Sequence, residues 1–143
     1  SPTTWLVFVA DVSRSTARFT ENNPAGPYVP EAVGTVISAG VGVDGFPRTF
    51  AGLRWRYFGS RALVEDNSVR SEPTSLVNLQ GGYQLSKHLR ATADVFNLLH
   101  AQHSDIEYYF ASRLSGEPLE GVEDIHLHPA IPRTVRVRMI VGF

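Results

Sequence analysis

The sequence contains no cysteine and a single lysine, Lys87, against twelve arginines. Without cysteine, the chain offers neither a disulfide framework nor a thiolate metal site. Its formal net charge is −1 and it has no basic run, so the composition gives no electrostatic reason to expect nucleic acid as a partner. Charged residues make up 19% of the chain, below the roughly 25% of ordinary soluble domains.

Long apolar runs are also missing. The longest one covers residues 5–10, whereas a transmembrane helix needs about 18 apolar residues. The length of 143 residues suits one domain or a piece of one, since domains cluster around roughly 100–150 residues. What the chain has instead is a two-residue alternation of apolar and polar side chains, which is typical of β-strands.

The alternation is clearest in residues 132–143, P-R-T-V-R-V-R-M-I-V-G-F. Successive strand residues point to opposite faces, so one face of this segment is wholly apolar and the other carries two arginines. A tilted membrane strand needs about 9–11 residues, and this segment is long enough. The arginines are Arg136 and Arg138, and the apolar residues are Val135, Val137, Met139, Val141 and Phe143.

Five earlier segments are also predicted as strands, and the connections between all six alternate between long and short. Residues 44–47, D-G-F-P, and residues 84–87 predict tight reversals, because Asp-Gly favours the positive φ of hairpin turns. Longer connections, many of them rich in Pro, Gly and polar residues, cover 19–30, 60–73 and 98–131. The five strands are expected at 4–18, 31–43, 48–59, 74–85 and 88–97.

From the second segment onward, odd-numbered positions form the apolar face and even-numbered positions the polar or small face. The phase of residues 4–18 is ambiguous, because 5–10 is continuously apolar. The pattern predicts an all-β fold: an antiparallel up-and-down meander of about six strands. With short turns at one rim and long loops at the other, it is typical of a transmembrane β-barrel with short periplasmic turns and long extracellular loops.

An arginine on the lipid face of such a barrel would cost ~2–4 kcal/mol at the bilayer midplane, so the polar face is expected to line the lumen. A soluble antiparallel sandwich or lipocalin-like barrel, with the apolar face as its core, fits the same periodicity. The candidate lumen-lining residues are Arg54, Arg56, Asn78, Gln80, Arg90, Asp94, Arg136 and Arg138.

The long connection 98–131 carries the candidate ligand contacts. Aromatic rings there could stack on an aromatic ligand, and two histidines on an extended segment point the same way and could share an ion. Packing within the loop is the more common fate of both, so neither a metal nor a cofactor is expected. No nucleophile setting or acid–base pair is legible, so no enzyme is expected. These candidates are Tyr108, Tyr109, Phe110, His126 and His128.

Several motifs resemble the C-terminal barrel portion of TonB-dependent outer-membrane receptors. L-R-W-R-Y-F-G at 53–59, S-L-V-N-L-Q-G-G-Y-Q at 75–84 and A-T-A-D-V-F-N-L-L at 91–99 resemble its barrel hairpins. Residues 104–118 and 124–134 resemble the family's last extracellular loop. The closing strand resembles the C-terminal signal that the barrel-assembly machinery reads, carried here by Val137, Met139, Val141 and Phe143.

The resemblance implies import of a scarce nutrient, such as an iron–siderophore complex, across the bacterial outer membrane. Residues 1–143 would be the C-terminal barrel segment, without the plug domain and the earlier strands. The implied partners are outer-membrane lipid, the rest of the barrel, the plug, and TonB only through the missing N-terminal part. Taken alone, a sheet with open edges is expected to aggregate, oligomerise or refold around a soluble core. The alternative is a free-standing small β-barrel or sandwich that binds a ligand or partner without transport.

Overall fold

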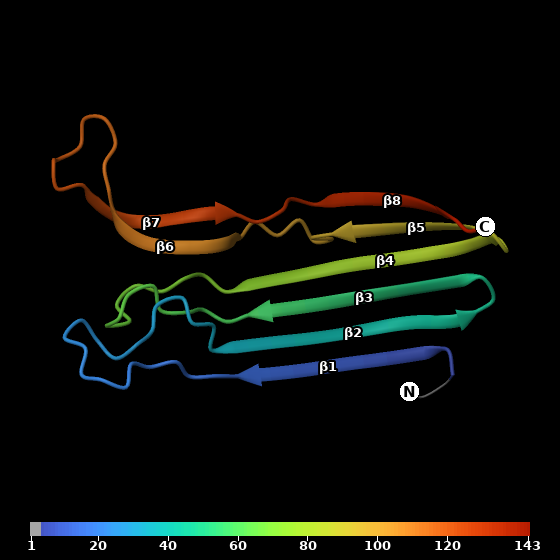
Figure 1. Ribbon diagram of the computed structural model, residues 1–143, viewed down its shortest axis with the longest axis horizontal. Helices are drawn as coiled ribbons and strands as arrows, with labels where there is room; N and C mark the ends of the chain where they lie inside the picture. Colours follow the sequence, from blue (N-terminus) through green and yellow to red (C-terminus); the bar gives the residue numbers. More distant parts are fainter. Residues whose placement is uncertain (1–3) are drawn as a thin grey trace.

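The computed structural model describes residues 4–143, and every regular element in that range is a β-strand. Six strands form one antiparallel sheet whose order follows the chain, β1-β2-β3-β4-β5-β8 (Figure 1). The predicted all-β, up-and-down meander is therefore confirmed. The strands of this sheet are β1 (Leu6–Arg14), β2 (Thr35–Phe46), β3 (Thr49–Phe58), β4 (Thr74–Ser86), β5 (Leu89–Phe96) and β8 (Thr134–Val141).

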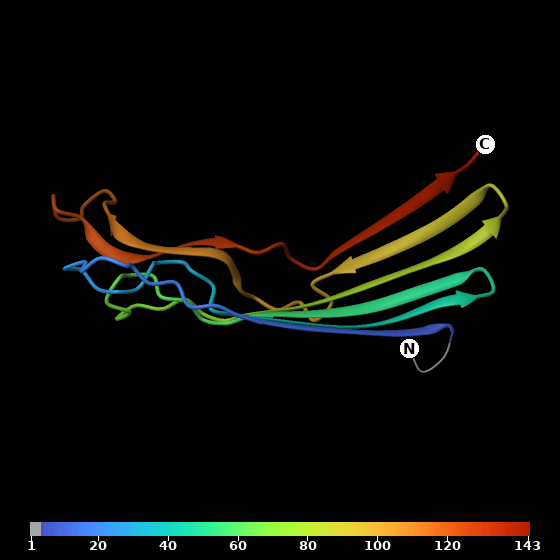
Figure 2. The ribbon, with the colours of Figure 1, turned by 60° about the horizontal axis from the view of Figure 1, so that its bottom comes forward.

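The sheet is curved and open. Figure 2 shows β5 and β8 rising away from the plane of β1, β2 and β3. β1 and β8 form the two edges, and they run in opposite directions (Figure 1). No helix within residues 4–143 is long and apolar enough to cross a membrane.

The pairing register fixes which side chains share a face. Up to the register shifts near the short turns, even-numbered residues of β2, β3, β4, β5 and β8 lie opposite even-numbered ones, as Arg54 does with Asn78 and Gln80 with Asp94. The phase changes in β1, where Val9 lies opposite Gly40. We call the side with the even-numbered residues of β2, β3, β4, β5 and β8, up to those shifts, and the odd-numbered residues of β1 the inner face, and the opposite side the outer face. The structure thus determines the phase that the apolar run 5–10 left open.

The predicted positions of the two tight turns are wrong by about two residues. β2 continues through Asp-Gly, and the chain reverses at Pro47 and Arg48, the latter with φ of 65°. Gly45, with φ of 81°, lies instead where the register shifts between Val43 and Phe46. A glycine in the left-handed region is what a β-bulge of this kind requires, so the Asp-Gly pair makes the bulge and not the turn. The second reversal, at 87–88, likewise follows a register shift after Gln84.

The sequence predicted a loop for the connection 98–131. The structure contains two more strands there. β6 (Ser104–Ser112) and β7 (Val122–Pro129) pair as an antiparallel hairpin that forms its own sheet. This hairpin lies beyond the long-loop end of the six strands (Figure 1). Both of its faces mix aromatic and charged side chains. Because polar and apolar residues do not alternate regularly in β6 and β7, the sequence pattern did not predict these two strands.

The sheet has almost no conventional core. Ala62 and Leu63, in the loop after β3, are the buried apolar residues among those described. Large apolar side chains of the outer face remain uncovered, such as Val137 at 70% exposure and Met139 at 57%. A soluble sandwich would bury these side chains under a second sheet. Within residues 4–143, the small β6–β7 sheet is the only other one, and it lies beyond the ends of the strands.

Candidate functional site: the inner face and the outer loops

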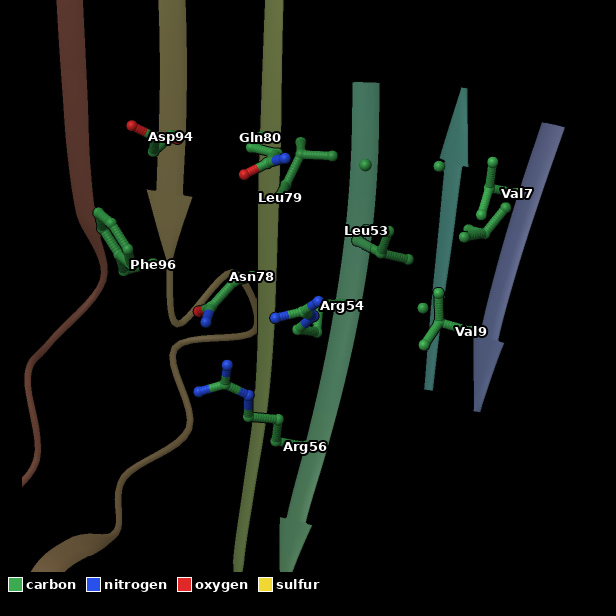
Figure 3. A pocket seen from close by; sticks show the side chains of 14 residues that line it. Val7, Val9, Leu53, Arg54, Arg56, Asn78, Leu79, Gln80, Asp94 and Phe96 are labelled. Carbon is green, nitrogen blue, oxygen red and sulfur yellow. The ribbon is translucent and has the colours of Figure 1, made fainter. Parts of the chain in front are cut away.

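The inner face of the sheet is hollowed by a cavity of about 310 Å³ (Figure 3). Five of the eight candidate lumen residues line it, from β3, β4 and β5. The remaining three, Arg90, Arg136 and Arg138, lie on the same face by register. The lining residues are Val7, Val9, Gly40, Val41, Gly42, Gly52, Leu53, Arg54, Arg56, Asn78, Leu79, Gln80, Asp94 and Phe96.

The lining changes character across the sheet. On the β1 side the lining is apolar, because Val7 and Val9 line the cavity there. Gly40 and Gly42 beside them have no side chains to fill it. From β3 onward the lining is polar. Among the paired residues, the register places five arginines and two aspartates, Asp11 and Asp94, on the inner face of the six strands. The face is therefore net positive and suits negatively charged groups.

Asp94 is the best-buried charge on this face, at 9% exposure. Its Oδ2 accepts a hydrogen bond from Nη2 of Arg138 at 2.8 Å, the one ion pair between described residues. Arg136, which lies directly opposite Asp94 in the register, instead places its guanidinium 5.2 Å from the ring centroid of Phe96. The two neighbouring arginines of β8 thus have different partners on β5.

A second arrangement on the inner face joins three strands. The Phe50 ring of β3 lies over Gly82 of β4 so closely that a Cβ there would collide with it. The guanidinium of Arg90 on β5 lies 4.3 Å from the centroid of the same ring, a cation–π geometry. An aromatic ring covering a strand glycine shields backbone that would otherwise be bare.

The β6–β7 hairpin separates the candidate ligand residues. Tyr108 lies opposite His126, and Ile106 opposite His128, so these share a face with Phe110, while Tyr109 points to the other side. The His126 ring stacks on Phe110 with centroids 3.9 Å apart and an interplanar angle of 16°. Its Nε2 lies 3.2 Å from the Phe110 carbonyl oxygen. His126 therefore packs within the hairpin, and residues 4–143 contain no group of three His, Asp or Glu side chains placed to hold a metal.

Tyr109 has a polar environment of its own. Its hydroxyl donates a hydrogen bond to Oε2 of Glu123, at 3.3 Å, across the opposite face of the hairpin. Desolvation raises the pKa of Tyr109 above its ordinary value, and the negative charge of Glu123 adds to the effect. The phenol accordingly stays protonated over a wider pH range than an isolated tyrosine.

Asn97 is a buried residue that the sequence did not single out. It follows β5, is 3% exposed, and has a positive φ of 49°. Its Nδ2 donates to the carbonyls of Ala101 and Ile131, and its Oδ1 accepts from the Ala101 amide at 2.9 Å. The Asn97 amide in turn donates to Oδ1 of Asn78 on β4. Asn97 thus fixes where the hairpin leaves the sheet and returns to it.

Glu107 was also missed, and it ties the hairpin to its neighbours. It is buried, and its Oε2 accepts a hydrogen bond from the amide of Glu72 at 3.0 Å. Backbone hydrogen bonds from Tyr28 and Glu31 reach the carbonyls of Glu65 and Ala62. The three long connections are therefore linked to one another at the same rim.

No protein-family model matches the sequence, and no curated protein matches it either. Among solved structures, the chain is similar to the ferric-catecholate import receptor Fiu of Escherichia coli K12 in its closed form. The TM-score is 0.72 at 16% sequence identity, over 96% of this chain. The chain has the fold of a TonB-dependent receptor barrel.

The match covers 19% of the Fiu chain, so this protein spans about a fifth of that receptor's length. The resemblance read from the motifs is thus confirmed at the level of the fold. The similar structure is a transport receptor rather than an enzyme. In a receptor barrel, a sheet of this kind is one stretch of wall, and its open edges are the places where further strands pair.

Proposed function

We propose that the chain is a wall segment of a TonB-dependent receptor that imports a scarce nutrient, such as an iron–siderophore complex, across the bacterial outer membrane. One observation carries the proposal. The sheet has two chemically opposite faces on a receptor-barrel fold. Val135, Val137 and Met139 stand uncovered on the outer face, whereas Arg54 and Arg138 lie on the inner one. Hydrocarbon outside and water inside satisfy both faces at once.

Aromatic residues at the two rims support the same orientation. Trp55 and Tyr57 lie on the outer face at the long-loop end of β3, with ring centroids 6.3 Å apart. The indole N–H of Trp55 donates to Oγ of Ser75 at 2.8 Å. Tyr83 lies on the outer face near the short turns, and Phe143 follows β8 at that rim. Rings at both ends of the strands are typical of membrane–water interfaces.

The charge of the inner face bears on the substrate. The five arginines and two aspartates that the register pairs on the inner face favour a negatively charged substrate. Fiu imports a ferric catecholate, and metal-bound catecholates are anionic. In the proposed receptor, the linked outer loops would form the entrance. TonB would supply energy through parts of the receptor outside these residues, and the C-terminal strand would be read by the barrel-assembly machinery.

Neighbouring residues of β8 test the membrane orientation. The chain has no cysteine, so Val137→Cys and Arg138→Cys each introduce a single thiol for a fluorescent probe. In lipid vesicles, brominated lipid should quench the Val137 probe and aqueous iodide the Arg138 probe. Val122→Cys, in the outer hairpin, is the aqueous control. Equal quenching of both β8 probes by iodide would refute a lipid-facing wall.

The import step has its own test. Cells that make the whole receptor containing this segment would be supplied with iron only as a ferric catecholate. Arg54→Glu with Arg56→Glu should slow uptake, because the two substitutions reverse the charge of the cavity lining. Asn22→Ala, an exposed loop change, should leave uptake unchanged. Normal uptake in the double variant would contradict the proposal that an anionic substrate passes along the inner face.

A further inference from the structure

The cavity of the inner face has two chemically different sides. Val7 and Val9 of β1 line one side, and Arg54 of β3 and Gln80 of β4 line the other (Figure 3). The cavity lies near the middle of β2 and β3, between the two rims of the sheet. A group that fills it therefore meets apolar surface at one end and a positive charge at the other.

Glycines form the floor between these two sides. Gly42 of β2 lies opposite Gly52 of β3, and neither has the positive φ that requires glycine. A Cβ would meet its nearest neighbour at 3.8 Å on Gly42 and at 3.6 Å on Gly52, which are ordinary contact distances. The local geometry thus admits a larger side chain at both positions. Glycine inside a strand weakens it and often marks a place where a ligand approaches the backbone closely.

The positive charge on the other side is not used within the sheet. Arg54 and Arg56 are exposed on the inner face, and neither belongs to an ion pair within residues 4–143. Asp94 is the acidic residue in the lining, and its Oδ2 already accepts a hydrogen bond from Arg138, which lies outside the lining. The two arginines of β3 are therefore suited to acidic oxygen atoms of a ligand, which a guanidinium binds through two parallel hydrogen bonds.

We propose that the cavity binds one flat aromatic ring that carries acidic oxygen atoms, with the ring on the glycine floor and the oxygen atoms toward Arg54. A flat ring can lie against the bare backbone and contact Val7 and Val9 with its edge. A saturated ring is thicker and cannot approach the floor over its whole area. An aliphatic anion would use the arginine but leave the floor and the valines uncovered.

The size of the cavity limits what enters it. Its volume of about 310 Å³ is at the lower end of the roughly 300–1,000 Å³ of ligand pockets. It suits one ring with its substituents rather than a whole metal complex. The inference rests on the proposed function, because the cavity would hold one aromatic arm of the anionic substrate half-way between the outer loops and the short-turn rim.

Two small anions of equal charge test the preference for a flat ring. The whole receptor that contains this segment would be titrated in detergent with salicylate and with cyclohexanecarboxylate, and saturation-transfer NMR would give the two dissociation constants. Salicylate should bind about fivefold more tightly or better, because its ring is flat. Arg54→Gln should weaken salicylate binding by about fivefold or more. Arg133→Gln, a loss of positive charge outside the cavity, is the control and should not weaken it.

Filling the floor tests the site itself. Gly42→Val combined with Gly52→Val should weaken salicylate binding by about fivefold or more, because the new side chains occupy the place of the ring. Gly52→Ala alone should give a smaller loss in the same direction. Gly81→Val is the matched control, since it makes the same change on the outer face of β4, and it should leave salicylate binding unchanged.

Stability separates a binding floor from a bend in the sheet. Valine suits a strand better than glycine does, so the filled variant should resist urea at least as well as the unmodified receptor. Glycines that serve only to curve the sheet would behave in the opposite way. Lower stability of the filled variant, together with unchanged salicylate binding by Gly52→Ala, would overturn the proposal.

Equal affinity for salicylate and cyclohexanecarboxylate would also overturn it, as would unchanged salicylate affinity in the filled variant. If the double valine variant does not fold, Gly52→Ala and Arg54→Gln decide the matter. These outcomes are separate from those of the proposed function. Slow uptake by the Arg54→Glu and Arg56→Glu receptor, with unchanged salicylate affinity in the filled variant, would refute only the aromatic site. Iodide quenching of both β8 probes would refute the membrane wall itself.

Discussion

The side chain of Asn97 is hydrogen-bonded to the carbonyl oxygen of Ile131, with Nδ2 and the oxygen 3.2 Å apart. This contact joins the end of β5 to the segment that leads into β8. It spans the whole β6–β7 insertion, so a single amide fixes the base of a connection that is more than thirty residues long.

Replacing Asn97 by alanine should destabilise the chain. The substitution leaves the Ala101 amide and the Ile131 carbonyl without their partner, and a buried unsatisfied group costs about 1–3 kcal/mol. Urea unfolding of the detergent-folded protein measures the loss. Asn22→Ala removes an exposed loop asparagine and should change the free energy of unfolding very little. An equal effect of both substitutions would contradict the role given to Asn97.

Gly82→Ala should also destabilise, because the new Cβ would collide with the Phe50 ring. Overpacking of this kind costs typically 1–3 kcal/mol. Combining it with Phe50→Leu should cost less than the sum of the two single changes, since the ring that clashes is gone. Gly81→Ala is the matched control, because a Cβ there meets only an ordinary contact at 3.6 Å. Strict additivity in the urea unfolding series would rule out the clash.

The two partners of the ion pair should respond unequally to substitution. The Arg138 side chain is 52% exposed and that of Asp94 12% exposed. Arg138→Ala leaves a largely buried carboxylate unpaired, whereas Asp94→Asn leaves a guanidinium that water can solvate. We therefore expect Arg138→Ala to lower the free energy of unfolding more than Asp94→Asn does. Arg133→Ala serves as a control for the loss of a positive charge, and the reverse order would show that Asp94 is not effectively buried.

Asp66 provides a pH-dependent prediction in an outer loop. Hydrogen bonds from the Ser68 hydroxyl and amide, at 2.7 and 2.9 Å, hold the pKa of Asp66 below its ordinary value. The stabilisation they give is present above the ordinary carboxyl pKa and is lost as the pH falls through the lowered one. Ser68→Ala removes the hydroxyl hydrogen bond and should raise the pKa of Asp66 in an NMR titration. Ser115→Ala, in the hairpin tip, should not move the pKa of Asp66.

Much of the sheet could be predicted from the two-residue alternation. The alternation identified β5 and β8 correctly, because polar side chains such as Arg90 and Arg138 lie on their inner face. It failed in β1, where Val7 and Val9 make the inner face apolar as well. The turns were misplaced because Gly45 serves a bulge, and the chemistry of Asp-Gly does not distinguish a bulge from a turn.

The contacts that organise the outer loops could not be read from the sequence. Asn97 and Glu107 have partners about 35 residues away, at Ile131 and Glu72. Local patterns carry no information about such distant pairs, and both residues are also common on exposed surfaces. The hairpin itself was hidden because neither of its faces is purely polar or purely apolar. For the candidate site, the sequence predicted which residues share the inner face but not which of them pair.

The opposed directions of β1 and β8 have an evolutionary consequence. β1 starts and β8 ends beside the two short reversals, at the same rim of the wall (Figure 1). A gene segment encoding such a block could be duplicated, moved or deleted without reversing the direction of any strand on either side. The circumference of a barrel built from such blocks would change by pairs of strands, because each block adds or removes whole hairpins.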